Sequence, residues 1–470
     1  MLTGSRLWFA MAALMFADVL SQLESSMIFA TLPAAARQFG SVSSAGWLFT
    51  AFALVAAGTA AVGGRLGDLY GRRRVLTAIV LLSGLGSIVC ILGSNHLGWM
   101  IAGRAIQGLS GAILPLAYGI VREIAPPQRA PFWIGTLAGV YGLTAGAGLI
   151  IGGLFSDAGH WQGIFYVTAI VPLFVAPALM FAVPPSVRYP RSGSIDIVGG
   201  LLFVPAIAGV LASISMADRL GMSMSLALGL GSAILLAFWV FHELRCKFPL
   251  IDVRLLRNSQ VALGNFIIVS CGIGQLQSSI MLMLLIQQPT WTGVGLGLSA
   301  TFASFVKLPA HLLTIVAGPL CGIVAQRFGT RTPMFYGSLA AAVAWLSITL
   351  FHGTVAEIMF GYIVAAFGTM MILAGVPNIL LAVAPESRSS EVLGLSSAIR
   401  TVSMAIGAQV ITMILDASSI QSGSKSYPDA HAFTLACLYI TMTGVACLIG
   451  SLGLASRRQE ALGLKIAARV

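Results

Sequence analysis

Long apolar stretches alternate with short polar connections along the whole chain. A run of about 18 or more apolar residues is long enough to cross the roughly 30 Å hydrocarbon core of a bilayer as a helix. By this criterion the pattern predicts an all-α polytopic membrane protein. The fourteen predicted transmembrane helices cover residues 7–33, 45–63, 75–94, 97–121, 132–155, 162–183, 197–217, 222–241, 260–287, 296–325, 332–351, 358–384, 392–415 and 430–455.

The first apolar run predicts a membrane helix that stays in the mature protein. It is longer than the apolar core of a secretory signal peptide, and it contains Asp18 and Glu24 where such a core is uncharged. An alanine-rich stretch after Pro33 leaves cleavage open as an alternative.

Composition supports a membrane location. Only 9 % of the 470 residues are charged, against about 25 % in soluble domains. The composition therefore excludes an ordinary soluble enzyme and a disordered protein. The six cysteines show no metal-ligand spacing, and five of them lie inside apolar runs. We therefore expect no disulfide framework and no metal site.

The net charge of +11 comes from short basic clusters between the apolar runs. That distribution favours a membrane surface over a nucleic-acid partner. With a cytoplasmic N-terminus, 20 of the 26 basic residues fall in inner loops and tails. The outer loops hold only Arg37, Arg219 and Lys425, and the other three lie within the predicted helices. Because Lys and Arg accumulate on the cytoplasmic side, we expect both termini there. The inner residues are Arg6, Arg65, Arg72, Arg73, Arg74, Arg122, Arg129, Arg188, Arg191, Arg245, Lys247, Arg254, Arg257, Arg327, Arg331, Arg388, Arg457, Arg458, Lys465 and Arg469.

An internal repeat divides the sequence. The segment 64–73 after the second predicted helix aligns with 322–331 after the tenth, at an offset of 258 residues. The same offset relates the first and ninth helices. This predicts two parallel six-helix bundles, at 1–190 and 259–470, separated by an inserted transmembrane pair and cytoplasmic linker at 191–258.

Five charged residues lie inside the predicted helices. A charge near the bilayer centre costs about 2.5–3.5 kcal/mol, so each should face a cavity or a partner. They are Asp18, Glu24, Arg104, Lys307 and Arg400.

The first helix carries a polar face beside Glu24. Its members recur at helical spacing and are Asp18, Ser21, Gln22 and Ser25. A carboxyl removed from water favours its neutral form and can exchange protons near neutral pH. The two acids are therefore candidates for proton coupling or for recognition of a cationic substrate. The alternative is a carboxyl neutralised by Arg104 or Lys307 that only holds helices together.

The remaining intramembrane polar groups also have two interpretations. Arg104, with Gln107 one turn later, either tunes a nearby carboxyl or forms a static ion pair. Lys307 and His311 lie one turn apart and either bind an anion, repel cations or titrate, or else make packing hydrogen bonds. The uncharged candidates line a cavity or join helices; they are Asn265, Gln275, Ser279 and Asn378.

The loop at 64–74 differs from the other connections. Asp68 is placed to cap a helix or pair with arginine, and Arg72, Arg73 and Arg74 follow it. Such a loop either locks one conformation through charge pairs or only enforces orientation. No phosphate-binding loop, metal cluster or activated nucleophile is visible, so we expect neither an enzyme nor a cofactor.

These residues resemble the major facilitator superfamily, and within it the fourteen-helix drug:proton antiporter branch. The resemblance covers nearly the whole chain. It rests on Gly64-x-Leu66-Gly67-Asp68-x-x-Gly71-Arg72-Arg73, Arg104-x-x-Gln107-Gly108, the first-helix stretch 23–33, Arg400 to Gly407, and Pro249-Leu250-Ile251-Asp252 beside the inserted pair. It implies that Arg104 takes part in proton transfer.

Several positions depart from that branch, among them Glu24 where its acid is usually aspartate and Thr144 where it has a glycine. The antiporter motif of the fifth predicted helix, residues 132–155, contains Gly148, Gly152 and Gly153 in this chain. Leu149 stands where the branch has proline. Gln326 replaces the aspartate of the second-half loop, so that loop cannot form the same charged lock. Asp18 is an acid beyond the usual first-helix pattern.

The resemblance implies a monomeric secondary transporter of the plasma membrane that rocks its halves around a central cavity. We expect it to export amphipathic, cationic compounds in exchange for protons, with the proton gradient as its energy source. Glu24 or Asp18 would alternate between proton and substrate, and Asp68, Arg72 and Arg73 would latch the outward-open state. Two alternatives remain open: an exporter of a lipid or metabolite with an anionic group held by Lys307 and Arg400, or a non-transporting membrane sensor.

Overall fold

The computed structural model describes residues 2–39, 42–186, 196–215, 221–247, 249, 251–298, 300–422 and 425–455. Several sequence-based predictions fall outside this range: the bundle boundary at 190–191, Leu250 of the linker motif, and the basic residues Arg188, Arg191, Arg219, Arg457, Arg458, Lys465 and Arg469.

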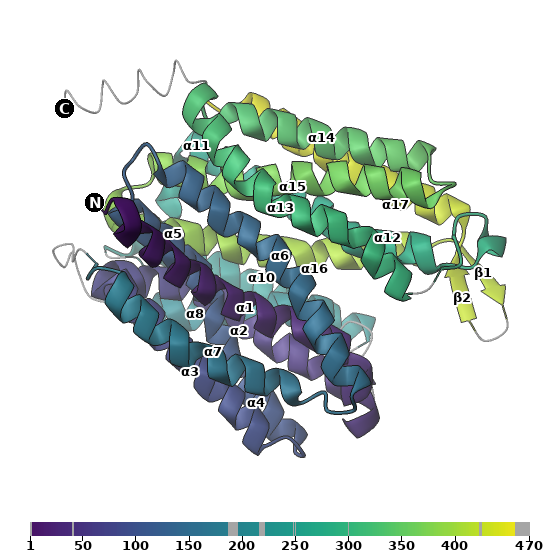
Figure 1. Ribbon diagram of the computed structural model, residues 1–470, viewed down its shortest axis with the longest axis horizontal. Helices are drawn as coiled ribbons and strands as arrows, with labels where there is room; N and C mark the ends of the chain where they lie inside the picture. Colours follow the sequence, from purple (N-terminus) through teal and green to yellow (C-terminus); the bar gives the residue numbers. More distant parts are fainter. Residues whose placement is uncertain are drawn as a thin grey trace. The chain divides into compact units, whose positions relative to one another are not determined.

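The described chain is almost entirely helical (Figure 1). Its α-helices are α1 (Gly4–Phe39), α2 (Val42–Tyr70), α3 (Arg72–Leu92), α4 (Leu97–Gln107), α5 (Ile113–Ile124), α6 (Ala130–Asp157), α7 (Gly163–Ala182), α8 (Ile197–Ser215), α10 (Met222–Arg245), α11 (Ser259–Ile273), α12 (Ser278–Gln287), α13 (Ala300–Phe328), α14 (Arg331–Leu350), α15 (Val355–Val383), α16 (Ser389–Asp416) and α17 (Ala430–Leu452). Short 3₁₀ turns are η1 (Gly108–Ala112), η2 (Val253–Arg257), η3 (Gln275–Gln277), η4 (Thr290–Thr292) and η5 (Glu386–Arg388).

Among the described residues, thirteen helices are long and apolar enough to cross a membrane. The predicted helix at 197–217 corresponds to α8, of which the described residues give an apolar stretch Val198–Ile214, and residues 216–217 lie outside the described range. The multi-pass membrane prediction is therefore confirmed, while the count of fourteen and the cytoplasmic termini stay predictions.

Two predicted spans are interrupted by 3₁₀ turns. The span at 97–121 consists of α4, η1 and α5, and the span at 260–287 consists of α11, η3 and α12. At the second break, the side-chain Nε2 of Gln277 donates to the carbonyls of Gly272 at 2.9 Å and Met404 at 3.0 Å. This side chain thus satisfies the carbonyl of Gly272 at the break, as a bilayer core requires, and also connects the break to α16.

The chain forms two compact units. The first contains residues 1–133, 143–257 and 381–398, and the second contains 134–142, 258–380 and 399–470. Helices α6 and α16 each contribute to both units.

The core of the first unit is built on close helix contacts. Apolar side chains of α1, α2, α3, α4 and α7 pack together, with Met27, Met100 and Phe165 almost fully buried. A Cβ on Gly86 of α3 would lie 2.7 Å from the carbonyl oxygen of Gly103 of α4. Only glycine allows these two helices to approach so closely.

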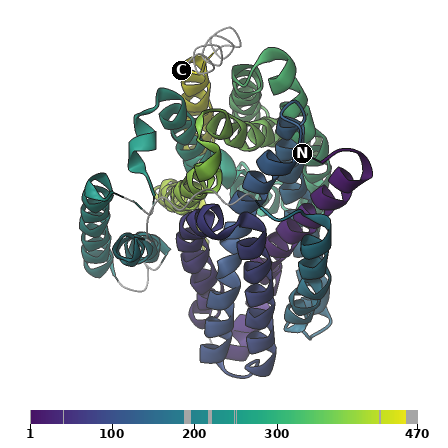
Figure 2. The same cartoon turned by 90° about the vertical axis from the view of Figure 1, so that its left-hand side faces the viewer.

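The inserted pair, α8 and α10, packs as an antiparallel hairpin at the side of α2 (Figure 2). The rings of Phe203 and Trp239 meet with centroids 4.7 Å apart. Val204 lies against α2, where its side chain is 3.2 Å from a Cβ placed on Gly58.

The core of the second unit centres on Trp345 of α14 and Phe433 of α17, both almost fully buried. A short antiparallel hairpin joins α16 to α17, and its strands are β1 (Ser419–Ser422) and β2 (Lys425–Pro428). Ile420 pairs with Tyr427 in this hairpin. The sequence analysis predicted no strand in this connection, residues 416–429 between the last two predicted helices.

Candidate functional site

Glu24 lies inside the first unit, between α1, α3 and α4. Its side chain is 2 % exposed. The hydroxyl of Ser83 on α3 donates a short hydrogen bond to Glu24 Oε1, while Oε2 has no hydrogen-bond partner among the described residues. This carboxyl is therefore buried and held by Ser83, and the hydroxyl of Ser110 also faces it.

Arg104 is held next to Glu24 by neutral acceptors. Its Nη1 donates to the main-chain carbonyl of Glu24 at 3.0 Å and to Gln107 Oε1 at 2.8 Å. Its Nε donates to the carbonyl of Leu48 at 2.9 Å, and its guanidinium lies 4.5 Å from the ring centroid of Phe52. In the described part of the chain Arg104 forms no ion pair with a carboxylate. The static Glu24–Arg104 ion pair considered from the sequence is therefore not formed in this conformation.

A chain of hydroxyl groups extends from Arg104 to α7. The Nε2 of Gln107 donates to Ser87 Oγ at 2.7 Å and to Thr168 Oγ1 at 3.3 Å, and Ser87 donates to Thr168 at 2.9 Å. Sequence analysis missed Ser83, Ser87 and Thr168. The spacing of Ser83 and Ser87, one turn apart in an apolar helix, was a signal that could have identified the first two.

Asp18 has different surroundings from Glu24 although both lie on α1. Asp18 is fully buried, and its Oδ1 accepts a 3.4 Å hydrogen bond from Gln22 Nε2 on the same helix. Ser21 donates to the carbonyl of Ser110 at 3.2 Å, and Ser25 donates to the carbonyl of Gln22 at 3.0 Å. The structure thus places Asp18 with Gln22, and Glu24 with the Arg104 cluster.

The connection between α2 and α3 holds a second polar cluster within the first unit. Gly71 ends α2 with a φ of 100°, a conformation that favours glycine. Asp68 Oδ1 accepts from Arg72 Nε at 2.7 Å. Its Oδ2 accepts from the backbone N–H of Glu391 at 3.0 Å, in the first turn of α16. Asp68 therefore pairs with an arginine and caps a helix at the same time.

The Arg72 side chain donates hydrogen bonds to four acceptors. Besides Asp68, it donates to Glu123 Oε1 at 2.7 Å and to the carbonyls of Gly119 at 3.1 Å and Glu386 at 2.6 Å. Its side chain is 1 % exposed. Only an arginine fork offers enough donors, in fixed directions, for this arrangement.

Further charge pairs extend this cluster to the linker after α10. Arg65 pairs with Glu391 at 3.1 Å, and Arg388 pairs with Asp252 at 2.6 Å. The backbone N–H of Asp252 donates to Glu391 Oε1 at 2.7 Å. A Cβ on Gly64 would overlap the carbonyl oxygen of Ser390, so α2 and α16 are in contact there. We call the set Arg65, Asp68, Arg72, Glu123, Asp252, Arg388 and Glu391 the loop network.

Arg73 is not part of the loop network. Its Nη1 donates to the carbonyls of Met180 at 3.2 Å and Val183 at 2.8 Å, at the end of α7, and its backbone N–H donates to Ser186 Oγ at 2.9 Å. Conversely, the sequence analysis did not include Glu123, Asp252, Arg388 or Glu391 among its candidates.

The glycines of the helix-5 motif lie in α6, and two of them contact α1. A Cβ on Gly148 would overlap Ser26 Oγ, and one on Gly152 would overlap the carbonyl oxygen of Met27. A Cβ on Gly153 would meet nothing within 4 Å. The close contact with α1 is present although Leu149 replaces the proline of the antiporter motif.

We expect Gly152→Ala to destabilise the protein by about 1–3 kcal/mol, because the added methyl meets backbone atoms that cannot rotate away. Gly153→Ala, one residue along the same helix, is the matched control and should not destabilise the protein, because alanine favours a helix over glycine by about 1 kcal/mol and the methyl meets no atom there. Thermal unfolding of the purified variants in detergent checks both. Equal melting temperatures for the two variants would contradict the contact.

The cationic candidates of the second half lie within the second unit. Lys307 on α13 is 6 % exposed and has no ion pair with any described carboxylate. His311, one turn later, lies beside Lys307 and the backbone of Gly142. The Arg400 guanidinium lies 5.7 Å from the ring centroid of Tyr141.

The uncharged candidates in this unit make mostly helix contacts. The amide nitrogens of Asn265 and Asn378 donate to carbonyls one turn earlier in their own helices, each at 2.9 Å. Gln275 Nε2, at the η3 break, donates to the carbonyl of Ile440 on α17 at 2.7 Å. Its Oε1 is buried and has no partner among the described residues. These contacts fit the structural interpretation for Asn265 and Asn378, and leave Gln275 with an available acceptor.

Comparison with known proteins agrees with this architecture. Residues 14–408 match the family model of the Major Facilitator Superfamily. The tetracenomycin C resistance and export protein of Streptomyces glaucescens is 25 % identical over 91 % of this chain and 78 % of its own length. The multidrug efflux pump LfrA of Mycolicibacterium smegmatis is 28 % identical over 88 % of this chain and 81 % of its own length.

A solved structure shows the same fold. The human organic anion transporter MFSD10 superposes with a TM-score of 0.63 at 13 % identity, covering 96 % of this chain and 100 % of its own. With the helical architecture and the family match over most of the chain, the protein is a multi-pass membrane protein and a secondary transporter, not an enzyme, and it belongs to the Major Facilitator Superfamily.

Proposed function

We propose that this transporter exports amphipathic, cationic compounds across the plasma membrane in exchange for protons, acting as a monomer. The observation that carries the proposal is the buried carboxyl of Glu24, which accepts from Ser83 and forms no ion pair with the described residues. An intramembrane ionisable group of this kind is typical of proton and ion pathways.

Glu24 would carry the proton, and Arg104 would respond to the charge of Glu24. Because Arg104 is bound by neutral acceptors, its charge is not cancelled by a carboxylate in this conformation. Deprotonation of Glu24 creates a negative charge beside that guanidinium and favours its rearrangement toward the carboxylate. This change in pairing couples the proton to the positions of α1 and α4.

Asp18 and Gln22 would contact the substrate. They form a polar face on the otherwise apolar α1, separate from the Glu24 cluster. A carboxylate in apolar surroundings attracts a cation that also has apolar surface, which is the chemistry of an amphipathic amine. Gln107 would remain with Arg104, since its side chain is already bonded at both ends.

Export is supported by the relatives and by the α6 contact. Two relatives are named for resistance and export or for multidrug efflux. Gly148 and Gly152 keep the close contact between α6 and α1 without the motif proline. The loop network would then stabilise one end state of the transport cycle, because its buried ion pairs must break before its members can separate.

Substrate-driven proton movement tests the proposal. In inverted membrane vesicles that hold an acid interior, adding a lipophilic cation should release protons outward, read with a pH-sensitive fluorescent dye. Vesicles with the transporter should respond, and vesicles without it should not. A substrate that accumulates without any proton release would contradict the exchange.

Lys307 favours a second candidate, an exporter of a lipid or metabolite with an anionic group. A buried ammonium without a carboxylate partner among the described residues attracts an anion. In this case an anionic lipid should compete with the transported dye, and Lys307→Ala should remove the competition. Lys247→Ala, at an exposed lysine, is the matched control. Competition that survives in Lys307→Ala would exclude this role for Lys307.

A further inference from the structure

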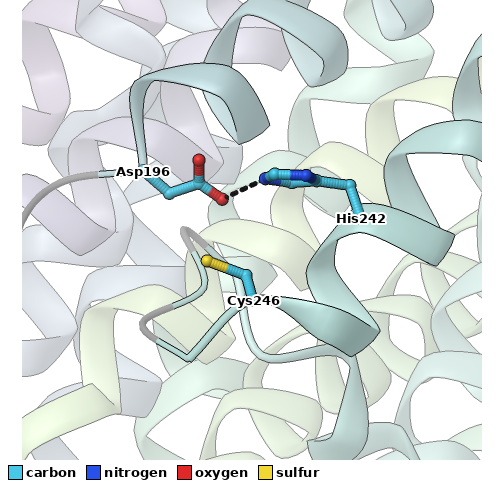
Figure 3. A group of neighbouring side chains, drawn as sticks. All are labelled: Asp196, His242 and Cys246. Carbon is cyan, nitrogen blue, oxygen red and sulfur yellow. Dashed lines mark hydrogen bonds and ion pairs between the residues drawn. The ribbon is translucent and has the colours of Figure 1, made fainter.

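We propose that Asp196, His242 and Cys246 form a binding site for a divalent transition metal of the zinc type. Asp196 immediately precedes α8, His242 lies in the last turn of α10, and Cys246 is the first residue after α10. The three side chains point toward one another at this end of the inserted pair (Figure 3). This site is separate from the Glu24 cluster and goes beyond the proposed transport function.

The geometry needs only small side-chain movements to hold a metal. One ligand atom from each of the three residues lies within 4.8 Å of the other two. Asp196 Oδ2 and His242 Nε2 are 2.8 Å apart and share a hydrogen bond. In a tetrahedral zinc site, a carboxylate oxygen and an imidazole nitrogen are about 3.4 Å apart, and a sulfur and a nitrogen are about 3.6 Å apart. Side-chain movements of well under about 2 Å therefore suffice.

The donor set selects the class of metal. Imidazole nitrogen and thiolate sulfur prefer Zn²⁺, Co²⁺ and related ions, whereas Ca²⁺ and Mg²⁺ require mainly oxygen ligands. On binding, the Cys246 thiol releases its proton to water and the His242 ring coordinates in its neutral form. The Asp196 carboxylate contributes the negative charge that completes a three-residue set.

Glu243 places a second carboxylate beside this set. Glu243 Oε1 and Asp196 Oδ2 each lie 2.6 Å from the Cβ position of Gly199, so these oxygens are within about 5 Å of each other. Glu243 is fully buried and forms no ion pair with the described residues. Two neighbouring carboxylates in a buried position repel each other, and a divalent cation would offset that repulsion.

Neighbouring groups hold the ligands in place. Asp196 Oδ1 accepts from the backbone N–H of Gly199 at 2.8 Å, and Glu243 Oε1 accepts from Trp239 Nε1 at 3.0 Å. Arg254 Nη2 donates to the carbonyls of Leu244 at 2.8 Å and Cys246 at 3.4 Å. Outer-shell hydrogen bonds of this kind orient ligands in metal sites.

The sequence analysis expected no metal site because it searched for short cysteine and histidine spacings. His242 and Cys246 are four residues apart on one helical face, but Asp196 lies 46 residues before His242. Only the packing of α8 on α10 brings the third ligand to the other two. A bound metal would fasten the start of α8 to the end of α10 and to the linker that carries Asp252.

Metal binding to the purified, full-length, tag-free protein tests the proposal. The metal-stripped protein is titrated with Zn²⁺ against a chromogenic chelator, and with Co²⁺ while the thiolate-to-cobalt absorption is recorded. The unmodified protein should bind one Zn²⁺ and show that absorption. Cys246→Ser should lose the absorption, and His242→Gln and Asp196→Asn should weaken Zn²⁺ binding by at least about tenfold.

Matched controls separate this site from other histidines and thiols. His96→Gln, at an exposed histidine, and Cys447→Ser, at a buried cysteine, should bind metal like the unmodified protein. Two results would overturn the proposal: no thiolate-to-cobalt absorption in the unmodified protein, or unchanged absorption and affinity in Cys246→Ser. The first result needs no variant, so a substitution that fails to fold cannot hide it.

Discussion

Replacing Glu24 by glutamine is expected to abolish pH-gradient-driven accumulation of substrate, to the level of vesicles that lack the transporter. The substitution keeps the size of the side chain and an oxygen that can accept from Ser83. It removes the only function that glutamine cannot reproduce, the binding and release of a proton. Initial rates of dye uptake into inverted vesicles under an imposed pH gradient measure the effect.

The same variant should still exchange substrate downhill. Exchange of labelled for unlabelled substrate at equal pH needs no net proton movement, so it should survive in Glu24→Gln. Asp18→Asn is the matched control on the same helix, and should retain gradient-driven uptake with a changed KM. If Asp18→Asn loses coupling while Glu24→Gln keeps it, the roles of the two acids are exchanged.

Arg72→Lys is expected to be strongly destabilising, while Arg73→Lys, the same change one residue later, is not. Lysine cannot span the four acceptors of Arg72, so at least one buried acceptor loses its donor, at about 1–3 kcal/mol for each. Arg73 is half-buried and donates to two carbonyls at the end of α7, one of which lysine can still reach.

Thermal unfolding and transport together measure this difference. Arg72→Lys should lower the melting temperature and the transport rate, whereas Arg73→Lys should change both only slightly. Asp157→Asn, at an exposed aspartate of α6, controls for charge changes in general. Equal effects at positions 72 and 73 would mean that the loop network does not stabilise the protein, and that the loop only enforces orientation in the membrane.

Hydropathy located the helices but not their interruptions. The predicted span 332–351 differs from α14 (Arg331–Leu350) by one residue at each end. The 3₁₀ turns at Gly108–Ala112 and Gln275–Gln277 were not predicted, since they lie inside runs whose mean hydropathy stays high enough for a continuous helix. Mean hydropathy reports the environment of the side chains and not the backbone hydrogen bonds within the run.

Sequence analysis identified only part of the loop network, for a related reason. Helix α2 continues to Tyr70, past the end of its apolar run at 63, and α16 begins before 392. Glu391 and Glu123 therefore fell just outside the predicted spans and were not counted as intramembrane charges. Arg65 and Glu391 are 326 residues apart in sequence, and only tertiary packing brings them together.

Transport by the purified protein alone tests the central claim most directly. The protein is reconstituted into liposomes, a pH gradient with an acid interior is imposed with no other energy source, and uptake of a lipophilic cation is followed. Proton exchange through Glu24 predicts uptake that disappears when the gradient is collapsed and is absent in Glu24→Gln. Uptake that is equal with and without the gradient, or unchanged in Glu24→Gln, would contradict the claim.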